Sequence, residues 1–246
     1  MNHTDREGCT LKRLGLVGGT GPESTIVYYK EINRLVSEKT GGAQFPELMV
    51  DSVNLFKMLP MCEAGDYDEV TDYLGAAVKR LADGGVDYVA FTAVTCHVVF
   101  PQTAALCPVP MISIPEATAD YAEAMGYRKV GLLGTIFTMD MDYMSRPMTE
   151  RGIEVVVPSG EEKRIVSDRI YSELEFGIIK PETVAELVAV IERMKVEDGI
   201  EAVILGCTEL PLALNDSNSP VPCLDTVKIH IDRLVKLIME EETYEK

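Results

Sequence analysis

The chain lacks the cysteine spacing of a metal site or of a disulfide framework. Its 246 residues include six cysteines, and no two of them form a C-x-x-C pair. Paired or regularly spaced cysteines are the usual sign of structural zinc and of small disulfide-rich domains. We therefore interpret the cysteines as buried or reactive thiols and expect no metal. Three of them stand in contexts that suggest no chemistry, namely Cys9, Cys107 and Cys223.

Basic residues are few relative to acidic ones. Lysine and arginine together number 23, against 40 aspartates and glutamates, and the formal net charge is −17. Such a charge repels phosphate backbones, so we expect no nucleic-acid partner. It does not exclude a small anionic substrate, because salt screens a distant surface charge within about 10 Å.

The chain also lacks the apolar runs that membranes require. No run approaches the roughly 18 apolar residues of a spanning helix. The stretch Met1–Arg13 is polar and has no apolar centre of the kind found in signal peptides. We therefore expect a cytoplasmic protein without a membrane partner.

What the chain does contain is two pairs of similar segments. Gly85–Ala93 resembles Gly199–Cys207, and Arg13–Gly19 resembles Lys129–Thr135 at nearly the same offset. Each segment runs apolar into a turn of small or polar residues, as a buried parallel strand does. The repeat predicts two lobes, which we place at residues 1–113 with 220–246 and at residues 114–219. The two copies differ at their last position, which is Ala93 in the first copy and Cys207 in the second.

Segments with helical periodicity lie between the predicted strands. We expect helices over Glu23–Ser37, Tyr67–Asp83, Pro181–Glu197 and Thr226–Glu242, from their apolar stripes. Strands alternating with helices at this spacing predict an α/β protein with two pseudo-symmetric lobes, each a mainly parallel sheet flanked by helices. Ligands bind beyond the carboxyl ends of such strands, so we expect an active site between the lobes.

The polar turns at the predicted strand ends are the candidate ligand-binding segments. Gly18–Thr25 is rich in glycine and suits an anion at a helix start, although a tight strand-helix turn explains it equally well. Cys207 follows a strand and precedes a helix start, which favours a lowered thiol pKa and partial exposure. Ser52 and Asn54 either reach the same cleft or cap the turn that follows them.

Taken together, several motifs resemble the cofactor-independent aspartate/glutamate racemase superfamily. They occur in the family's order, as Gly18-Gly19-Thr20-Gly21-Pro22-Glu23-Ser24-Thr25, Gly134-Thr135-x-x-Thr138-Met139, Gly206-Cys207-Thr208-Glu209 and Leu224-Asp225-Thr226-x-x-x-His230. The resemblance covers nearly the whole chain. It implies a homodimer, a small amino-acid or dicarboxylate substrate, and no pyridoxal phosphate or metal.

The resemblance also implies the roles of individual residues. Inversion at an α-carbon needs an acid and a base on opposite faces, and Cys207 takes one of these roles. The resemblance assigns the α-carboxylate to five threonines, with Glu209 beside them in the cysteine motif; these are Thr20, Thr95, Thr135, Thr138 and Thr208.

Two departures from the family pattern bear on the reaction and the substrate. The first-lobe turn, usually Cys or Thr, Asn, Thr, a variable residue and His, here reads Ala93-Val94-Thr95-Cys96-His97, and the resemblance places Ala93 and Val94 beside Thr95 among the substrate-binding positions. The second acid or base is therefore Cys96, His97 or absent. A lysine that meets the side-chain carboxylate in members acting on acidic amino acids is replaced by Ile165, with Lys163 and Arg164 adjacent.

Three functions remain open on the sequence. The leading interpretation is an amino-acid racemase of the aspartate/glutamate type, with Cys207 as one acid/base. The second is a single-cysteine decarboxylase or isomerase on the same scaffold, which the Ala93/Cys207 difference favours. The third is a metabolite-binding protein that has kept the cleft and lost part of the chemistry.

Overall fold

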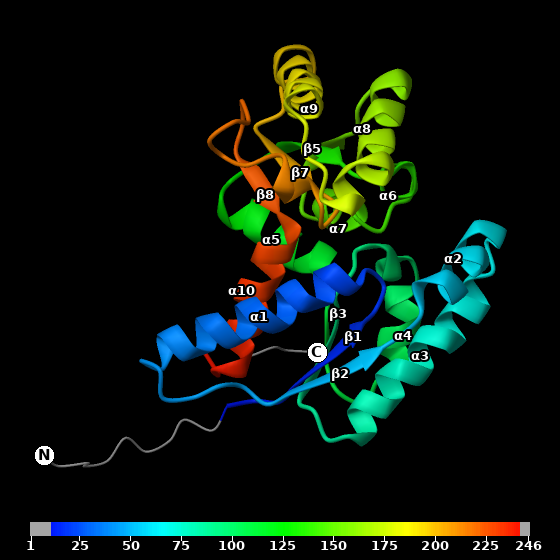
Figure 1. Cartoon of the computed structure of the whole chain (residues 1–246), viewed down its shortest axis with the longest axis vertical. Helices are drawn as coiled ribbons and strands as arrows, with labels where there is room; N and C mark the ends of the chain where they lie inside the picture. The colour runs from blue at the N-terminus through cyan, green and yellow to red at the C-terminus, as the bar shows by residue number, and fades with distance from the viewer. Residues whose placement is uncertain (1–10, 242–246) are drawn as a thin grey trace, which may run out of the picture. The chain divides into compact units, whose positions relative to one another are not determined.

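The computed structural model describes residues 11–241 and divides them into two compact units (Figure 1). The first unit takes the described part of Met1–Ala90, Thr103–Met111 and the described part of Ile231–Lys246. The second takes Phe91–Gln102 and Ile112–His230. Most of the polar N-terminal stretch, with Cys9, lies outside the described residues.

The first sheet has four strands in the order β2-β1-β3-β4. They are β1 (Leu14–Gly18), β2 (Leu48–Ser52), β3 (Tyr88–Phe91) and β4 (Met111–Ile112). β1 and β2 are parallel, and their register runs from Leu14 opposite Leu48 to Gly18 opposite Ser52. β1 is buried along its whole length, which explains why it reads as an uninterrupted apolar run.

Helices that follow these strands bury one stripe each. They are α1 (Pro22–Lys39), α2 (Leu55–Ala64), α3 (Tyr67–Asp83) and α4 (Phe100–Leu106). α1 starts with Pro22, whose fixed φ suits the first helical turn, and it buries Tyr28, Ile32 and Val36 at a four-residue spacing. The helix expected over Tyr67–Asp83 is confirmed as α3.

The second sheet has four parallel strands in the order β6-β5-β7-β8. They are β5 (Lys129–Leu133), β6 (Glu154–Val156), β7 (Ala202–Leu205) and β8 (Cys223–Asp225). The helices of this unit are α5 (Ile114–Ala124), α6 (Ile136–Asp140), α7 (Arg146–Glu150), α8 (Gly160–Ser172) and α9 (Pro181–Arg193), with short helical turns at Thr95–Val99, Leu174–Phe176, Met194–Asp198 and Leu210–Leu212. The helix α10 (Thr226–Ile238) begins in this unit and ends in the first.

Both faces of the second sheet are buried. Alternate side chains such as Val203 and Leu205 pack with residues of α8 and α9. Their neighbours Ala202 and Ile204 pack with residues of α5 and with Met148 of α7. Burial on both faces is typical of parallel sheets, and it accounts for the apolar copies seen in the sequence. The α/β class with two four-stranded parallel sheets flanked by helices is confirmed.

The boundary between the units differs from the one predicted. We expected residues 220–246 to join the first lobe. The described part of Ile231–Lys246 does group with the first unit, but β8 pairs with β7, with Val203 opposite Cys223. We also expected the boundary near residue 113, whereas Phe91–Gln102 groups with the second unit. Both differences have the same cause, because side-chain packing and strand pairing with the second sheet outweigh proximity along the chain.

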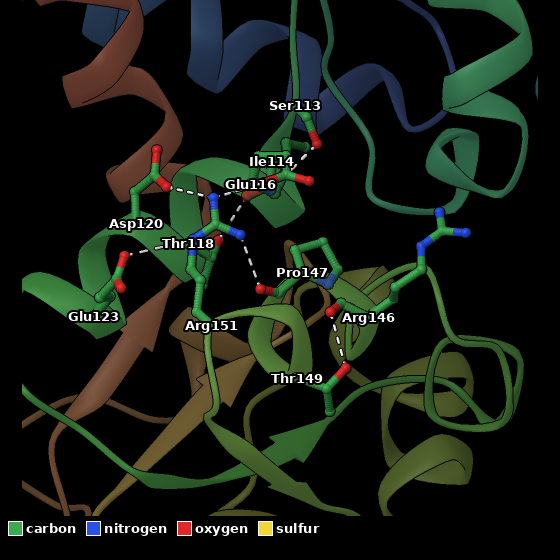
Figure 2. Close-up of polar contacts among 10 residues, drawn as sticks. All are labelled: Ser113, Ile114, Glu116, Thr118, Asp120, Glu123, Arg146, Pro147, Thr149 and Arg151. Carbon is green, nitrogen blue, oxygen red and sulfur yellow. Dashed lines mark hydrogen bonds and ion pairs between the residues drawn. The ribbon is translucent and has the colours of Figure 1, made fainter.

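Arg151 fastens α7 to α5 within the second unit (Figure 2). Its guanidinium nitrogens lie 2.8 Å from Glu116 and 2.6 Å from Asp120, and Nη1 donates to the carbonyl of Pro147 at 2.8 Å. The planar guanidinium can serve several acceptors at once, as a lysine cannot. The contacts hold the start of α5, where Ser113 accepts a hydrogen bond from the Glu116 N–H at 3.3 Å.

No helix within residues 11–241 is both long and apolar enough to cross a membrane.

Gly19 offers a test of how tightly the first glycine turn packs. Its φ is 84°, and a Cβ there would overlap the carbonyl oxygen of Val53 and lie 2.6 Å from Ser52 Oγ. We expect Gly19→Ala to lower the free energy of unfolding by about 3 kcal/mol, since backbone strain and overlap add. Gly41→Ala is the matched control, because Gly41 has a φ of 65° with open space around it. It should cost about 1 kcal/mol. Urea denaturation measures both, and equal losses would contradict the packing argument.

Candidate functional site

Two neighbouring strand ends of the second sheet approach each other closely. β5 and β7 end opposite each other, at Leu133 and Leu205, and a glycine follows each strand. The Gly206 N–H donates to the Leu133 carbonyl at 2.7 Å, and a Cβ on Gly206 would lie 2.8 Å from that oxygen. The missing side chains thus allow the contact, which places Thr135 and Cys207 at the same edge of the sheet.

Cys207 is half-buried, and its thiol donates a hydrogen bond to a carboxylate. Its Sγ donates to Glu209 Oε2 at 2.8 Å. Burial raises the pKa of Cys207 well above its ordinary value, and the negative charges of Glu209 and Glu175 raise it further. Our expectation of a lowered pKa was wrong. The helix dipole is weak because only the three-residue turn Leu210–Leu212 follows, and Glu209 lies closer to the sulfur.

The carboxylates beside the thiol are not neutralised by salt bridges. Within the described part of the chain, neither Glu209 nor Glu175 has a lysine or arginine within ion-pair distance. Burial and the charge of Glu209 raise the pKa of Glu175. Thr208 lies half-buried between Cys207 and Glu209. The neighbourhood of the sulfur is therefore acidic.

A chain of three hydroxyl groups follows β5. Thr135 caps α6, where its Oγ1 accepts from the Thr138 N–H at 3.3 Å and lies 3.2 Å from Thr138 Oγ1. Tyr143 donates to the buried Thr138 hydroxyl at 3.0 Å. Burial raises the pKa of Tyr143, and its hydrogen bond to Thr138 offsets only part of that rise. The phenol therefore keeps its proton.

α8 contacts the same turn through two side chains one helical turn apart. Ser167 Oγ accepts from the Ile136 N–H at 3.2 Å, and Lys163 Nζ lies 2.6 Å from Asp140. Lys163 is thus occupied by an ion pair. Arg164 is exposed and forms no ion pair with any described residue, and Ile165 is half-buried.

His97 serves the backbone at both ring nitrogens. Its Nε2 accepts from the Ile114 N–H at 3.0 Å, so the proton is on Nδ1, which lies 3.1 Å from the carbonyl of Val94. Burial lowers the pKa of His97 to about 4, so the ring is neutral at pH 7. Val94 packs in the core beside Ile114. This geometry favours a positioning role for His97 over proton transfer.

The other residues of this turn are enclosed to different degrees. Cys96 has 0% of its surface exposed, Ala93 is buried, and Thr95 is half-buried. Cys96 therefore does not reach solvent. The buried ring of His230, at the end of another family motif, has Nε2 3.1 Å from the carbonyl of Ile112.

The remaining predicted site residues lie in the first unit. In the glycine turn, the Gly19 N–H donates to Thr25 Oγ1 at 3.0 Å, and Thr20 is buried. Ser52 is exposed at the end of β2. Asn54 Oδ1 accepts from the Phe56 N–H at 2.9 Å and caps α2, which confirms the capping interpretation for this residue.

Sequence reasoning missed Tyr143, Ser167 and Asp140. Tyr143 stands in a methionine-rich segment that reads as core, and the partners of the other two depend on how α8 packs. The structure brings together Cys207, Glu209, Thr135 and Thr138 within the second unit. Among residues 11–241, no three His, Cys, Asp or Glu side chains are grouped so as to hold a metal ion.

A comparison with protein families matches almost the whole chain. The model described as Asp/Glu/Hydantoin racemase matches residues 17–234. Among curated proteins, the broad specificity amino-acid racemase RacX of Bacillus subtilis (strain 168) is 22% identical over 220 residues, which cover 87% of this chain and 92% of that protein.

Two solved structures are similar in both fold and sequence. A candidate Asp/Glu racemase from Yersinia pestis is 32% identical, with a TM-score of 0.88 over 93% of this chain and 100% of that one. An aspartate racemase homologue from Pyrococcus horikoshii OT3 is 37% identical, with a TM-score of 0.81 over 93% of this chain and 99% of that one.

The buried histidines predict how stability depends on pH. Burial lowers the pKa of His97 to about 4, and burial with the charge of His97 lowers that of His230 to about 3. Between these values and about 6.5 the unfolded chain binds more protons, so stability should fall as pH falls through this window. For His97 alone the loss approaches about 3 kcal/mol. Urea denaturation between pH 7 and pH 4 measures it. His97→Gln should be less stable at pH 7 but have a shallower pH slope; an unchanged slope would contradict the assignment.

Proposed function

Because the chain belongs to the Asp/Glu/hydantoin racemase family, we propose that it is an amino-acid racemase of the aspartate/glutamate type that works without pyridoxal phosphate. The observation that carries the proposal is the Cys207 thiol, which donates to Glu209 at the carboxyl end of β7. A sulfur at a strand end with hydroxyl donors on the neighbouring strand end suits proton transfer at a carbon next to a carboxylate.

The acidic neighbourhood sets the direction in which Cys207 acts. At rest the sulfur is protonated, because burial and Glu209 raise its pKa, so it can give a proton to the carbanion that remains once a base on the opposite face has taken the α-proton. The thiolate that results lies beside a carboxylate and is a stronger base than an ordinary thiolate. It can therefore take a proton back from the weakly acidic α-carbon with a smaller energy gap.

The threonine turn after β5 is the place we assign to the substrate's α-carboxylate. Thr135 is half-buried beside the start of α6, and Gly134 leaves the backbone open there. Negative charge spreads onto the carboxylate when the α-proton leaves. Fixed hydroxyl and N–H donors stabilise that charge without reorganisation.

The ion pair of Lys163 affects which substrate side chains the site can bind. A second carboxylate needs a cation, yet Lys163 Nζ is held 2.6 Å from Asp140. We infer a site that accepts amino acids other than aspartate and glutamate. The described specificity of RacX, a relative at 22% identity, agrees with this inference.

A single-thiol decarboxylase is the second candidate function. Ala93 stands where the family pattern has a second acid or base, and Cys96 has no exposed surface. Loss of carbon dioxide from a substituted malonate leaves a carbanion that one proton from Cys207 completes. Carbon dioxide release from such malonates, without α-proton exchange in amino acids, would favour this function over racemisation.

The test of the racemase proposal is α-proton exchange in deuterated water. We expect both enantiomers in a panel of amino acids to exchange, and Cys207→Ala to lower the rate by about a hundredfold or more, as loss of a general acid does. Proton NMR with chiral chromatography measures exchange and inversion separately. Cys223→Ser is the matched control, since Cys223 is also half-buried, and it should keep the wild-type rate.

Retention of the α-proton in every amino acid would end the proposal. Ligand-induced stabilisation that persists in Cys207→Ala would then indicate a binding protein.

A second variant tests the role of the ion pair in specificity. Asp140→Asn removes the partner of Lys163 and frees an ammonium group beside the threonine turn. We expect kcat/KM for aspartate and glutamate to rise severalfold relative to that for alanine. Asp140→Glu keeps the charge and serves as the control. Equal ratios in wild type and Asp140→Asn would show that Lys163 does not read the side chain.

A further inference from the structure

Tyr143 determines how the protons of the threonine turn are arranged. Its side chain is 4% exposed, and its ring lies 6.1 Å from that of Phe137. Because the phenol keeps its proton, it must donate, and its partner is Thr138 Oγ1 at 3.0 Å. A buried hydroxyl without a partner would be costly, so this direction is strongly preferred.

The direction of that first bond determines the next one. Thr138 is 2% exposed, and its oxygen already accepts from Tyr143. Its own hydroxyl proton must therefore go to another acceptor, and Thr135 Oγ1 lies 3.2 Å away. The chain then runs from Tyr143 through Thr138 to Thr135.

The Thr135 hydroxyl can act towards a ligand only as a hydrogen-bond donor. Its oxygen accepts from the Thr138 N–H at 3.3 Å and from the Thr138 hydroxyl, which occupies both lone pairs. Its own O–H is then available only as a donor. Thr135 is half-buried and directly follows Gly134, which lies next to the strand end that carries Cys207. A donor at that edge suits an anion.

We propose that Tyr143 is a positioning residue that makes the Thr135 hydroxyl an obligatory donor to the α-carboxylate of the substrate. This inference rests on the proposed function, since it assigns the anion to an amino acid. Tyr143 itself touches no substrate and moves no proton. It removes the alternative in which the two threonines point their protons at each other and present a lone pair to the carboxylate.

The direct test is Tyr143→Phe, which removes the hydroxyl and keeps the ring. We expect KM for the best amino-acid substrate to rise between about threefold and tenfold, the range of one neutral hydrogen bond, with kcat within about twofold. A purely structural role would lower the unfolding midpoint without this split between KM and kcat. Tyr121→Phe is the matched control, because Tyr121 is an exposed tyrosine of α5. It should leave both constants unchanged.

A double-mutant cycle separates the chain of bonds from independent effects. Thr138→Val breaks the same chain at its second link and should raise KM by a similar factor. Combining it with Tyr143→Phe should add nothing further, because one broken link already frees Thr135. Additive effects, or a fall in kcat with KM unchanged, would overturn the inference. Should Tyr143→Phe fail to fold, Thr138→Val carries the same expectation.

Calorimetric binding of alanine and of alaninamide keeps this test separate from the proposed function. If the wild type binds alanine more tightly than alaninamide and Tyr143→Phe loses the preference, the inference stands even without turnover. Equal binding of the two compounds to the wild type, or no binding of either, would overturn it.

Discussion

The candidate site depends on a close approach of two strand ends that only glycine permits. Gly206 donates its N–H to the carbonyl of Leu133, and a Cβ at Gly206 would crowd that oxygen. A side chain there would separate the ends of β5 and β7. Cys207 and Thr135 would separate with them, since each is the next residue along its turn. In the Gly206-Cys207 dipeptide, the glycine makes the close contact with Leu133 and the cysteine after it supplies the thiol.

Much of the fold could be predicted because parallel strands buried on both faces leave a simple pattern. One pair of repeated apolar segments forms β3 and β7, and the other pair forms β1 and β5. The apolar stripe over Tyr67–Asp83 belongs to α3. The unit boundary could not be predicted in the same way. β8 has three residues, which are too few to show a periodic pattern. Its pairing with β7 depends on how the whole sheet assembles. Packing of Val94 against Ile114 is likewise a tertiary event.

The place of Cys207 in the fold was easier to predict than its protonation. The position of Cys207 after an apolar strand could be predicted from the sequence, but the direction of its pKa could not. That direction depends on a side-chain rotamer, because Glu209 turns its carboxylate to the sulfur. Tyr143 gave no signal, since a tyrosine among methionines reads as core until its hydroxyl is seen on Thr138. Sequence patterns indicate which side chains are buried, whereas the direction of a hydrogen bond depends on the tertiary structure.

The duplicated turns show how a repeat can divide its tasks. In the second copy the polar residues are only half-buried, and the Cys207 thiol donates to the carboxylate of Glu209. In the first copy the same kind of turn is drawn into the core of the second unit, where His97 accepts from the backbone of Ile114 and stays neutral. A buried neutral imidazole with both nitrogens engaged is a rigid clamp. The raised pKa of Cys207 depends in turn on exclusion of water, because burial is its largest cause.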